Sequence, residues 1–112
     1  ANTDTYAPFS GRGYVCCNQS KPDLSAPGVG ILSCAPGGGY TRKSGTSMAC
    51  PFVTGSAALL MQYGIINGND AYLYGQKVKA YLIRGARRTR AFETFPNDRV
   101  GWGMLCVADS IP

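Results

Sequence analysis

The most informative feature of this chain is a serine in a glycine-flanked loop that runs directly into an apolar helix pattern. The octet at residues 44–51, SGTSMACP, carries it. A helix start offers unpaired backbone N–H groups and a partial positive charge. A serine placed there can be exposed and fixed in orientation, and the nearby backbone N–H groups can bind an oxyanion. Acyl transfer requires both features. The octet therefore predicts that Ser47 is a hydrolase nucleophile at a helix start.

The helix after Gly45 is the best-supported element. Apolar residues recur at helical spacing: Val53, Ala57, Leu60 and Met61. Pro51 is tolerated in a first turn, and Gly64 is a suitable terminator. Gly55 and the alanines should let this helix pack tightly against its neighbours.

A second helix is predicted from about Gly75 to Arg84, after a turn at residues 67–70. Its inward residues should be Val78, Leu82 and Ile83, and its outward residues Lys77 and Lys79. Gly85 is expected at the C′ position, just past the helix end.

Strands are expected on both sides of the helices. Residues 29–34 read as a buried strand that a glycine-rich break at 36–39 ends, and residues 100–107 alternate glycine with apolar residues where another backbone approaches closely. Residues 23–26 form a short strand entering a turn, and residues 1–21 a surface loop with a short strand at 14–16. This order of strands and helices suits one α/β layered unit.

Taken with Ala26-Pro27-Gly28 upstream and VTGSAALL at 53–60, the octet resembles the subtilisin-like serine proteases. The resemblance extends over residues 21–34, 45–63 and 100–105. It implies that residues 1–112 are the C-terminal part of a catalytic domain with a three-layer α/β fold, a mostly parallel sheet flanked by helices. It also implies that Ser47 is the catalytic serine.

The same resemblance implies which residues contact substrate. Ser44, Gly45 and Thr46 would line the cleft beside the scissile bond, and Met48 would lie behind the nucleophile on the leaving-group side. The expected substrate is a protein or peptide. No cofactor and no metal are expected.

The chain contains no histidine, whereas the family works by an Asp, a His and a Ser. The acid, the base and the oxyanion-hole amide would all precede Ala1, so the N-terminal remainder of the protease domain is an expected partner. The chain alone should be inactive. The alternative is a pseudoprotease, in which a subtilisin-like fold without its Asp or His acts as a binding or regulatory partner.

Three simpler interpretations compete with the nucleophile. Ser47 could be an ordinary helix N-cap, since serine is a favoured cap residue. Cys50 could be a rival nucleophile, because a helix N-terminus can lower the pKa of a thiol, although no histidine accompanies it. Lys43 could form a Ser-Lys dyad, but its charged neighbour Arg42 argues for solvent.

Phe52 departs from the commonest family pattern, which has histidine there. Together with residues 68–75 and 77–82, Phe52 resembles the clostridial subtilisin-like germination proteases and their gut-bacterial relatives. The compartment stays open, with an extracellular or spore-associated location in a bacterium as the expectation from this resemblance.

Charge and cysteine usage exclude some other functions. The net charge of +5 comes mainly from the arginines at 84–90, a run typical of a solvated surface. No stacking platform or reading helix accompanies the run, so no nucleic-acid partner is expected. The five cysteines (Cys16, Cys17, Cys34, Cys50 and Cys106) have no paired spacing, which favours small buried thiols over zinc.

Neither a signal peptide nor a transmembrane run is evident, so no membrane partner is expected. A segment cut from a larger sheet would expose a strand edge and helix faces, which promote pairing with another chain. The isolated chain is therefore expected to self-associate.

Overall fold

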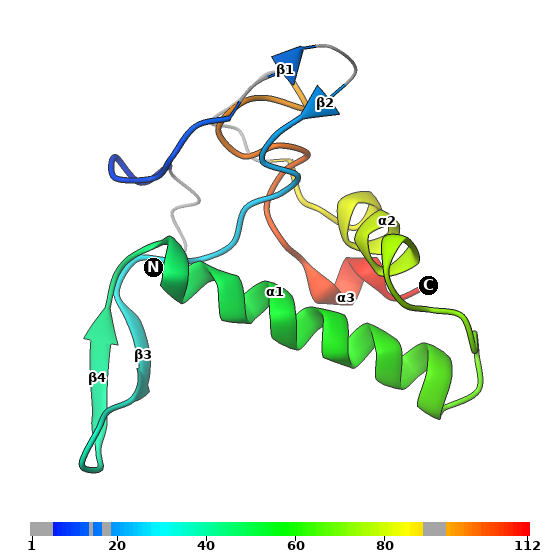
Figure 1. The fold of residues 1–112 in the computed structure, drawn as a ribbon, viewed down its shortest axis with the longest axis horizontal. Coiled ribbons are helices and arrows are strands. Elements are labelled where there is room, and N and C mark those ends of the chain that lie inside the picture. The colour runs from blue at the N-terminus through cyan, green and yellow to red at the C-terminus, as the bar shows by residue number, and fades with distance from the viewer. Residues whose placement is uncertain (1–5, 14, 17–18, 89–93) are drawn as a thin grey trace.

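The computed structural model describes residues 6–13, 15–16, 19–88 and 94–112. A long helix, α1 (Thr46–Met61), runs across the molecule. The other elements are β1 (Val15–Cys16), β2 (Gln19–Ser20), β3 (Ile31–Cys34), β4 (Tyr40–Lys43), the π-helix η1 (Gln62–Ile66), α2 (Gln76–Arg84) and α3 (Val107–Ser110). In Figure 1 the β3–β4 hairpin projects from the N-terminal end of α1, while α2 and α3 lie beside its second half.

The core lies between α1 and α2. Its buried residues are Leu60, Leu73, Val78 and Leu82. Leu24, Val53, Ala57 and Leu105 are among the half-buried residues that pack against it. The core face of α1 thus has the helical spacing that the sequence predicted.

The end of the first helix differs from the prediction. Gly64 does not terminate it, because the chain continues through η1 to Ile66. A Cβ at Gly64 would lie 2.6 Å from the Leu73 Cβ and 2.8 Å from the Asp70 carbonyl oxygen. Gly64 therefore allows the returning segment to approach closely instead of ending the helix. Gly55 is also not tightly packed by this chain, since nothing described lies within 4 Å of a Cβ there.

A buried strand was predicted at 29–34. A strand does form there, at Ile31–Cys34, but it is mostly exposed. Ile31–Cys34 is one arm of an antiparallel hairpin with β4, in the register Ile31↔Lys43 to Cys34↔Tyr40. Leu32 is 56% exposed, because no second layer covers the hairpin within the described residues. The glycine-rich break at 36–39 forms the hairpin tip, where the Ala35 N–H donates to the Gly39 carbonyl at 3.0 Å.

Close backbone approach near residues 100–105 was predicted correctly. Met104 forms a parallel bridge with Ser25 and an antiparallel bridge with Arg87. A Cβ at Gly103 would lie 2.4 Å from the Arg87 carbonyl oxygen. The strand predicted at 100–107 does not form: Gly101 and Met104 take part only in isolated bridges, and α3 begins at Val107.

The second helix was predicted correctly at Gln76–Arg84, with Val78 and Leu82 buried. Lys79, predicted to point outward, is half-buried and pairs with Asp23 at 3.2 Å. Gly85 caps the helix with φ −85°, so it is not a left-handed C′ residue. A Cβ there would lie 2.3 Å from the Ser110 Oγ. Close packing against Ser110 therefore explains why this position is a glycine. Together these elements confirm the α/β class.

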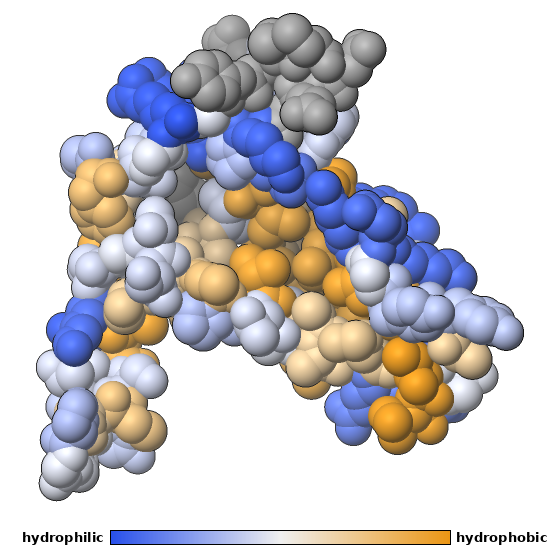
Figure 2. All heavy atoms as spheres, in the orientation of Figure 1, coloured by the Kyte–Doolittle hydropathy of each residue, from blue (hydrophilic) through white to orange (hydrophobic). Residues whose placement is uncertain are grey.

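The segment Thr46–Ile66 is long and apolar enough to cross a membrane by length and composition, with a mean hydropathy of 1.4 over its most apolar window. No such run was expected from the sequence. Core helices of water-soluble proteins meet the same criterion, and a helix that is apolar on all sides is normally buried in a larger core. Figure 2 shows orange spheres at the η1 end of this segment, where Ile66 is 77% exposed.

The arginine run lies on the surface, as predicted, over its described part. Arg84 stacks on Tyr81, Arg88 on Phe95, and Arg87 pairs with Asp109 at 3.4 Å. Residues 89 and 90 lie outside the described residues. Among the described cysteine side chains Cys34, Cys50 and Cys106 are free thiols, but Cys34 and Cys50 are exposed and not buried as predicted.

Candidate active site

Ser47 occupies the second residue of α1, immediately after a glycine turn. Gly45 is the N-cap, with φ 153°, a backbone conformation that side chains with a Cβ disfavour. The Gly45 N–H donates to the Gly28 carbonyl at 2.7 Å, and the Met48 N–H donates to the Gly45 carbonyl at 3.0 Å. The turn that precedes the helix is therefore held to the 26–28 segment on one side and to the helix on the other.

The polar groups of Ser47 are available for chemistry. Its side chain is exposed, and among the described residues its Oγ has no hydrogen-bond partner. Within the same part of the chain, the backbone N–H groups of Thr46 and Ser47 donate to no carbonyl. Unpaired N–H groups at a helix start attract negative charge, so this turn can stabilise an anion beside the serine hydroxyl.

Open space lies on one side of Ser47. A shallow pocket of about 410 Å³ is lined by Ser47, Cys50, Pro51 and Thr54. These residues are spaced by three and four, so they share one face of α1. Pro51 and Thr54 were not among the predicted site residues, although their helical spacing from Ser47 places them on the same face of α1.

The four predicted substrate-binding residues flank Ser47 but do not line this pocket. Ser44 and Thr46 are exposed, whereas Gly45 and Met48 are half-buried. The Ser44 Oγ accepts the Gly30 N–H at 2.8 Å, so this hydroxyl already has a partner within the chain. Their contact with substrate stays a prediction.

The interpretation of Ser47 as the N-cap is wrong. Gly45 is the cap residue and no side chain caps the helix, so Ser47 lies two residues inside the position that a capping serine occupies. Cys50 and Lys43 are both exposed. Cys50 shares the pocket with Ser47, and no histidine exists in the 112 residues to activate either side chain.

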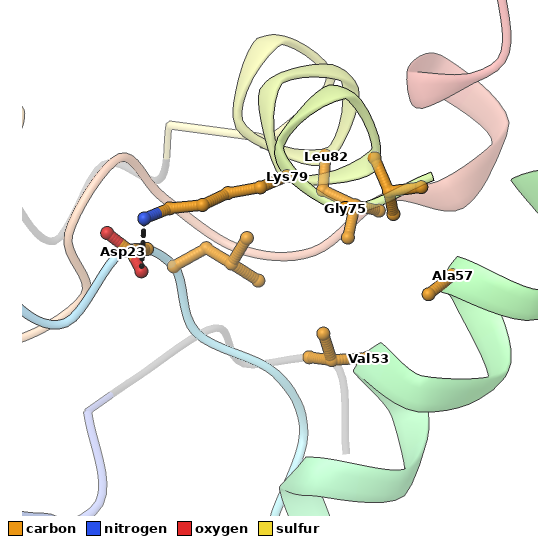
Figure 3. Close-up of a pocket in the computed structure, with 8 residues that line it drawn as sticks. Asp23, Val53, Ala57, Gly75, Lys79 and Leu82 are labelled. Atoms are coloured by element: carbon orange, nitrogen blue, oxygen red, sulfur yellow. Dashed lines mark ion pairs between the residues drawn. The ribbon is translucent and has the colours of Figure 1, made fainter. Parts of the chain in front are cut away.

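A second hollow, of about 380 Å³, separates α1 from α2 (Figure 3). Its apolar walls are Leu24, Val53, Ala57, Val78 and Leu82. At its rim the Asp23 carboxylate accepts hydrogen bonds from Lys79 at 3.2 Å and from Lys21 at 3.0 Å. Burial raises the pKa of Asp23, but the two lysines outweigh burial and the net pKa is lowered. Its ionisable lining residues, Asp23 and Lys79, are paired with each other, and no serine or cysteine is among the described residues that line it, so it is not the candidate site.

The model of the Subtilase family (Peptidase_S8) matches residues 1–103. A serine at a glycine-capped helix start within an α/β framework is consistent with that match. The chain belongs to the subtilase family.

Several relatives are similar to this chain over most of its length. Serine protease AprX of Bacillus subtilis is 40% identical over an alignment that covers all of this chain and 26% of AprX. The PII-type proteinase of Lactococcus lactis subsp. cremoris is 38% identical over 81% of this chain and 5% of that protein. The solved structure of the Clostridium perfringens CspB protease is 49% identical with a TM-score of 0.89, over 94% of this chain and 22% of the CspB chain. This chain therefore spans about a quarter or less of the length of these relatives.

Proposed function

We propose that the complete protein is a serine endopeptidase of the subtilase type, to which this chain contributes the nucleophile Ser47. The observation that carries the proposal is an exposed serine at the glycine-capped start of α1, whose Oγ and backbone N–H have no partner in the described part of the chain. Membership of the subtilase family and the similarity to proteases named AprX and CspB support it.

The general base must come from outside these 112 residues. An activating base needs to lie within hydrogen-bond reach of the hydroxyl it deprotonates, and this chain has no histidine. The pocket lined by Cys50, Pro51 and Thr54 is the open side of Ser47. The N-terminal remainder of the domain would bring its His, and the Asp that orients it, to that side.

The chemistry then follows the triad mechanism. The Ser47 Oγ attacks the scissile carbonyl while the imported His takes the hydroxyl proton, and the His later protonates the leaving amine. The Ser47 N–H donates to the oxyanion of the tetrahedral intermediate. Gly45 and Thr46 lie beside the scissile bond, and Met48 lies toward the leaving group.

The similarity to CspB of Clostridium perfringens also supports a place in the clostridial germination-protease branch. The substrate on this proposal is a protein or peptide. The competing function is that of a pseudoprotease. In that case the chain is part of a subtilisin-like domain that has lost its Asp or His and acts as a binding or regulatory partner.

An active-site-directed fluorophosphonate tests these alternatives directly. The complete protein should be labelled at Ser47, and the Ser47→Ala variant should not. The Cys50→Ala variant is the matched control, since Cys50 lines the same pocket, and it should be labelled like the wild type. The isolated 112-residue chain should not be labelled, because it has no base. Failure of the complete protein to react would favour the pseudoprotease.

A further inference from the structure

Gly30 lies just outside the β3–β4 hairpin. The hairpin ladder ends at the Ile31↔Lys43 pair. One residue beyond it, two side chains take the place of backbone pairing. The Gly30 N–H donates to the Ser44 Oγ at 2.8 Å, and the Arg42 Nη1 donates to the Gly30 carbonyl at 2.7 Å. We call Gly30, Arg42 and Ser44 the Gly30 clamp.

The Gly30 clamp adjoins the turn that carries the nucleophile. Two residues before Gly30, the Gly28 carbonyl accepts the N–H of Gly45, the N-cap of α1, at 2.7 Å. A Cβ at Gly28 would lie 2.7 Å from the Gly45 carbonyl oxygen. The two loops are thus in close contact, and a shift of residues 28–30 would be transmitted to the start of α1.

Hydrophobic packing does not provide an alternative anchor within the described part of the chain. The core cluster there includes no residue of β3 or β4, and the hairpin projects away from the helices in Figure 1. The hydrogen bonds at the hairpin base are therefore the contacts that fix the direction in which the hairpin meets α1.

We infer that Arg42 and Ser44 are positioning residues, which act through Gly30 to hold the Ser47 hydroxyl and N–H in the geometry of the reaction. The inference rests on the proposed function. Oxyanion donors and nucleophiles are effective only when they are fixed before the reaction begins, and a displacement of about 1 Å can cost about a hundredfold in rate. Ser44 would then contribute through its bond to Gly30, not through contact with substrate.

The test uses the complete protein with four variants of the Gly30 clamp and one control variant. Arg42→Met and Ser44→Ala each remove one bond to Gly30, whereas Arg42→Lys and Ser44→Thr keep a donor or a hydroxyl. Ser33→Ala is the matched control, since Ser33 is an exposed hairpin serine with no side-chain hydrogen bond to another described residue. Titration with a fluorophosphonate counts the active molecules in each sample. The acylation rate per active molecule, the KM for a peptide substrate and the Tm are then measured.

If the Gly30 clamp positions Ser47, Arg42→Met and Ser44→Ala should each lower the acylation rate per active molecule by between about threefold and about a hundredfold. The KM should stay within about twofold of the wild-type value. Arg42→Lys and Ser44→Thr should recover most of the rate, and Ser33→Ala should match the wild type. A fall in Tm or in the number of active molecules, with an unchanged rate per active molecule, would show a purely structural role and overturn the inference. Absence of labelling in the wild type would instead refute the proposed function, and the clamp with it.

Discussion

At the scale of single residues, the chemistry of Ser47 depends on its position two residues past a glycine cap. The hydroxyl of a serine at the cap position itself would accept a hydrogen bond from a backbone N–H of the first turn. Because Gly45 takes the cap position with φ 153°, the Ser47 hydroxyl and N–H both stay free of partners among the residues that the structure describes. The glycine before the serine is therefore as much a requirement of the site as the serine.

Replacing Ser47 by alanine in the complete protein should reduce kcat for peptide hydrolysis by roughly six orders of magnitude, the loss known for the serine of subtilisin, from which the figure is taken. The fold should not change, because the side chain is exposed and unbonded. Steady-state hydrolysis and a thermal melt check both statements. Activity of Ser47→Ala above one hundredth of wild type would contradict the assignment of the nucleophile.

At the scale of elements, close approach explains the glycines better than helix termination does. Gly64 lies in η1, where a Cβ would lie 2.6 Å from the Leu73 Cβ and 2.8 Å from the Asp70 carbonyl oxygen. Sequence periodicity placed the helix correctly, but a glycine near a helix end has two explanations, and only the returning 70–73 segment decides between them.

Gly64→Ala should destabilise the complete protein by about 1–3 kcal/mol, because the added methyl overpacks a buried position. Gly11→Ala is the control, since no described residue lies within 4 Å of a Cβ there, and it should change the free energy of unfolding by less than about 0.5 kcal/mol. Denaturant unfolding measures both. Equal effects of the two substitutions would refute the packing explanation.

The ion pair between Asp23 and Lys79 connects the segment between β2 and β3 to α2. The lysines lower the pKa of Asp23 in the folded protein, so its contribution to stability is present above the ordinary aspartate pKa and is lost as pH falls through the lowered one. Since the pair is partly exposed, Asp23→Asn should cost about 1 kcal/mol or less at pH 7.

The pH dependence of unfolding tests whether the pKa of Asp23 is lowered in the folded protein. Unfolding of the wild type and of Asp23→Asn in the complete protein should converge as pH falls below about 4. A difference between the two that grows on acidification would contradict the lowered pKa.

At the scale of the whole molecule, the long helix α1 has faces that the described part of this chain does not cover. Ser47, Cys50, Pro51 and Thr54 face open space on one side of α1. Another stripe at seven-residue spacing exposes Phe52, Leu59 and Ile66, with Leu59 half exposed. A helix with apolar residues on several faces is stable in water only when other segments cover it.

The isolated 112-residue chain should therefore self-associate. Size-exclusion chromatography with light scattering should give a mass that rises with concentration, and replacing Leu59 and Ile66 by glutamine should reduce the association. A stable, compact monomer of the unmodified chain at all concentrations would refute this prediction.

Helical spacing after Gly45 and within residues 75–84 was enough to predict α1 and α2, because this spacing depends on residues that are close in sequence. The order of the elements gave the α/β class, and the assignment of Ser47 as the nucleophile stays a prediction. The β3–β4 hairpin was missed because Arg42 and Lys43 give β4 no apolar alternation. The burial of 29–34 was predicted wrongly because the apolar residues of this strand suggested a covering layer that the described part of the chain does not contain.

The sequence by itself determined that one serine begins an apolar helix and that no base accompanies it. The tertiary structure alone decided that Gly45 and not Ser47 caps α1, that Gly64 and Gly85 are packing contacts, and that Arg42 and Ser44 hold Gly30. The physical reason is range: helical periodicity and the absence of a residue type are properties of the chain, whereas a carbonyl 2.7 Å from a distant N–H exists only after the chain has folded back on itself.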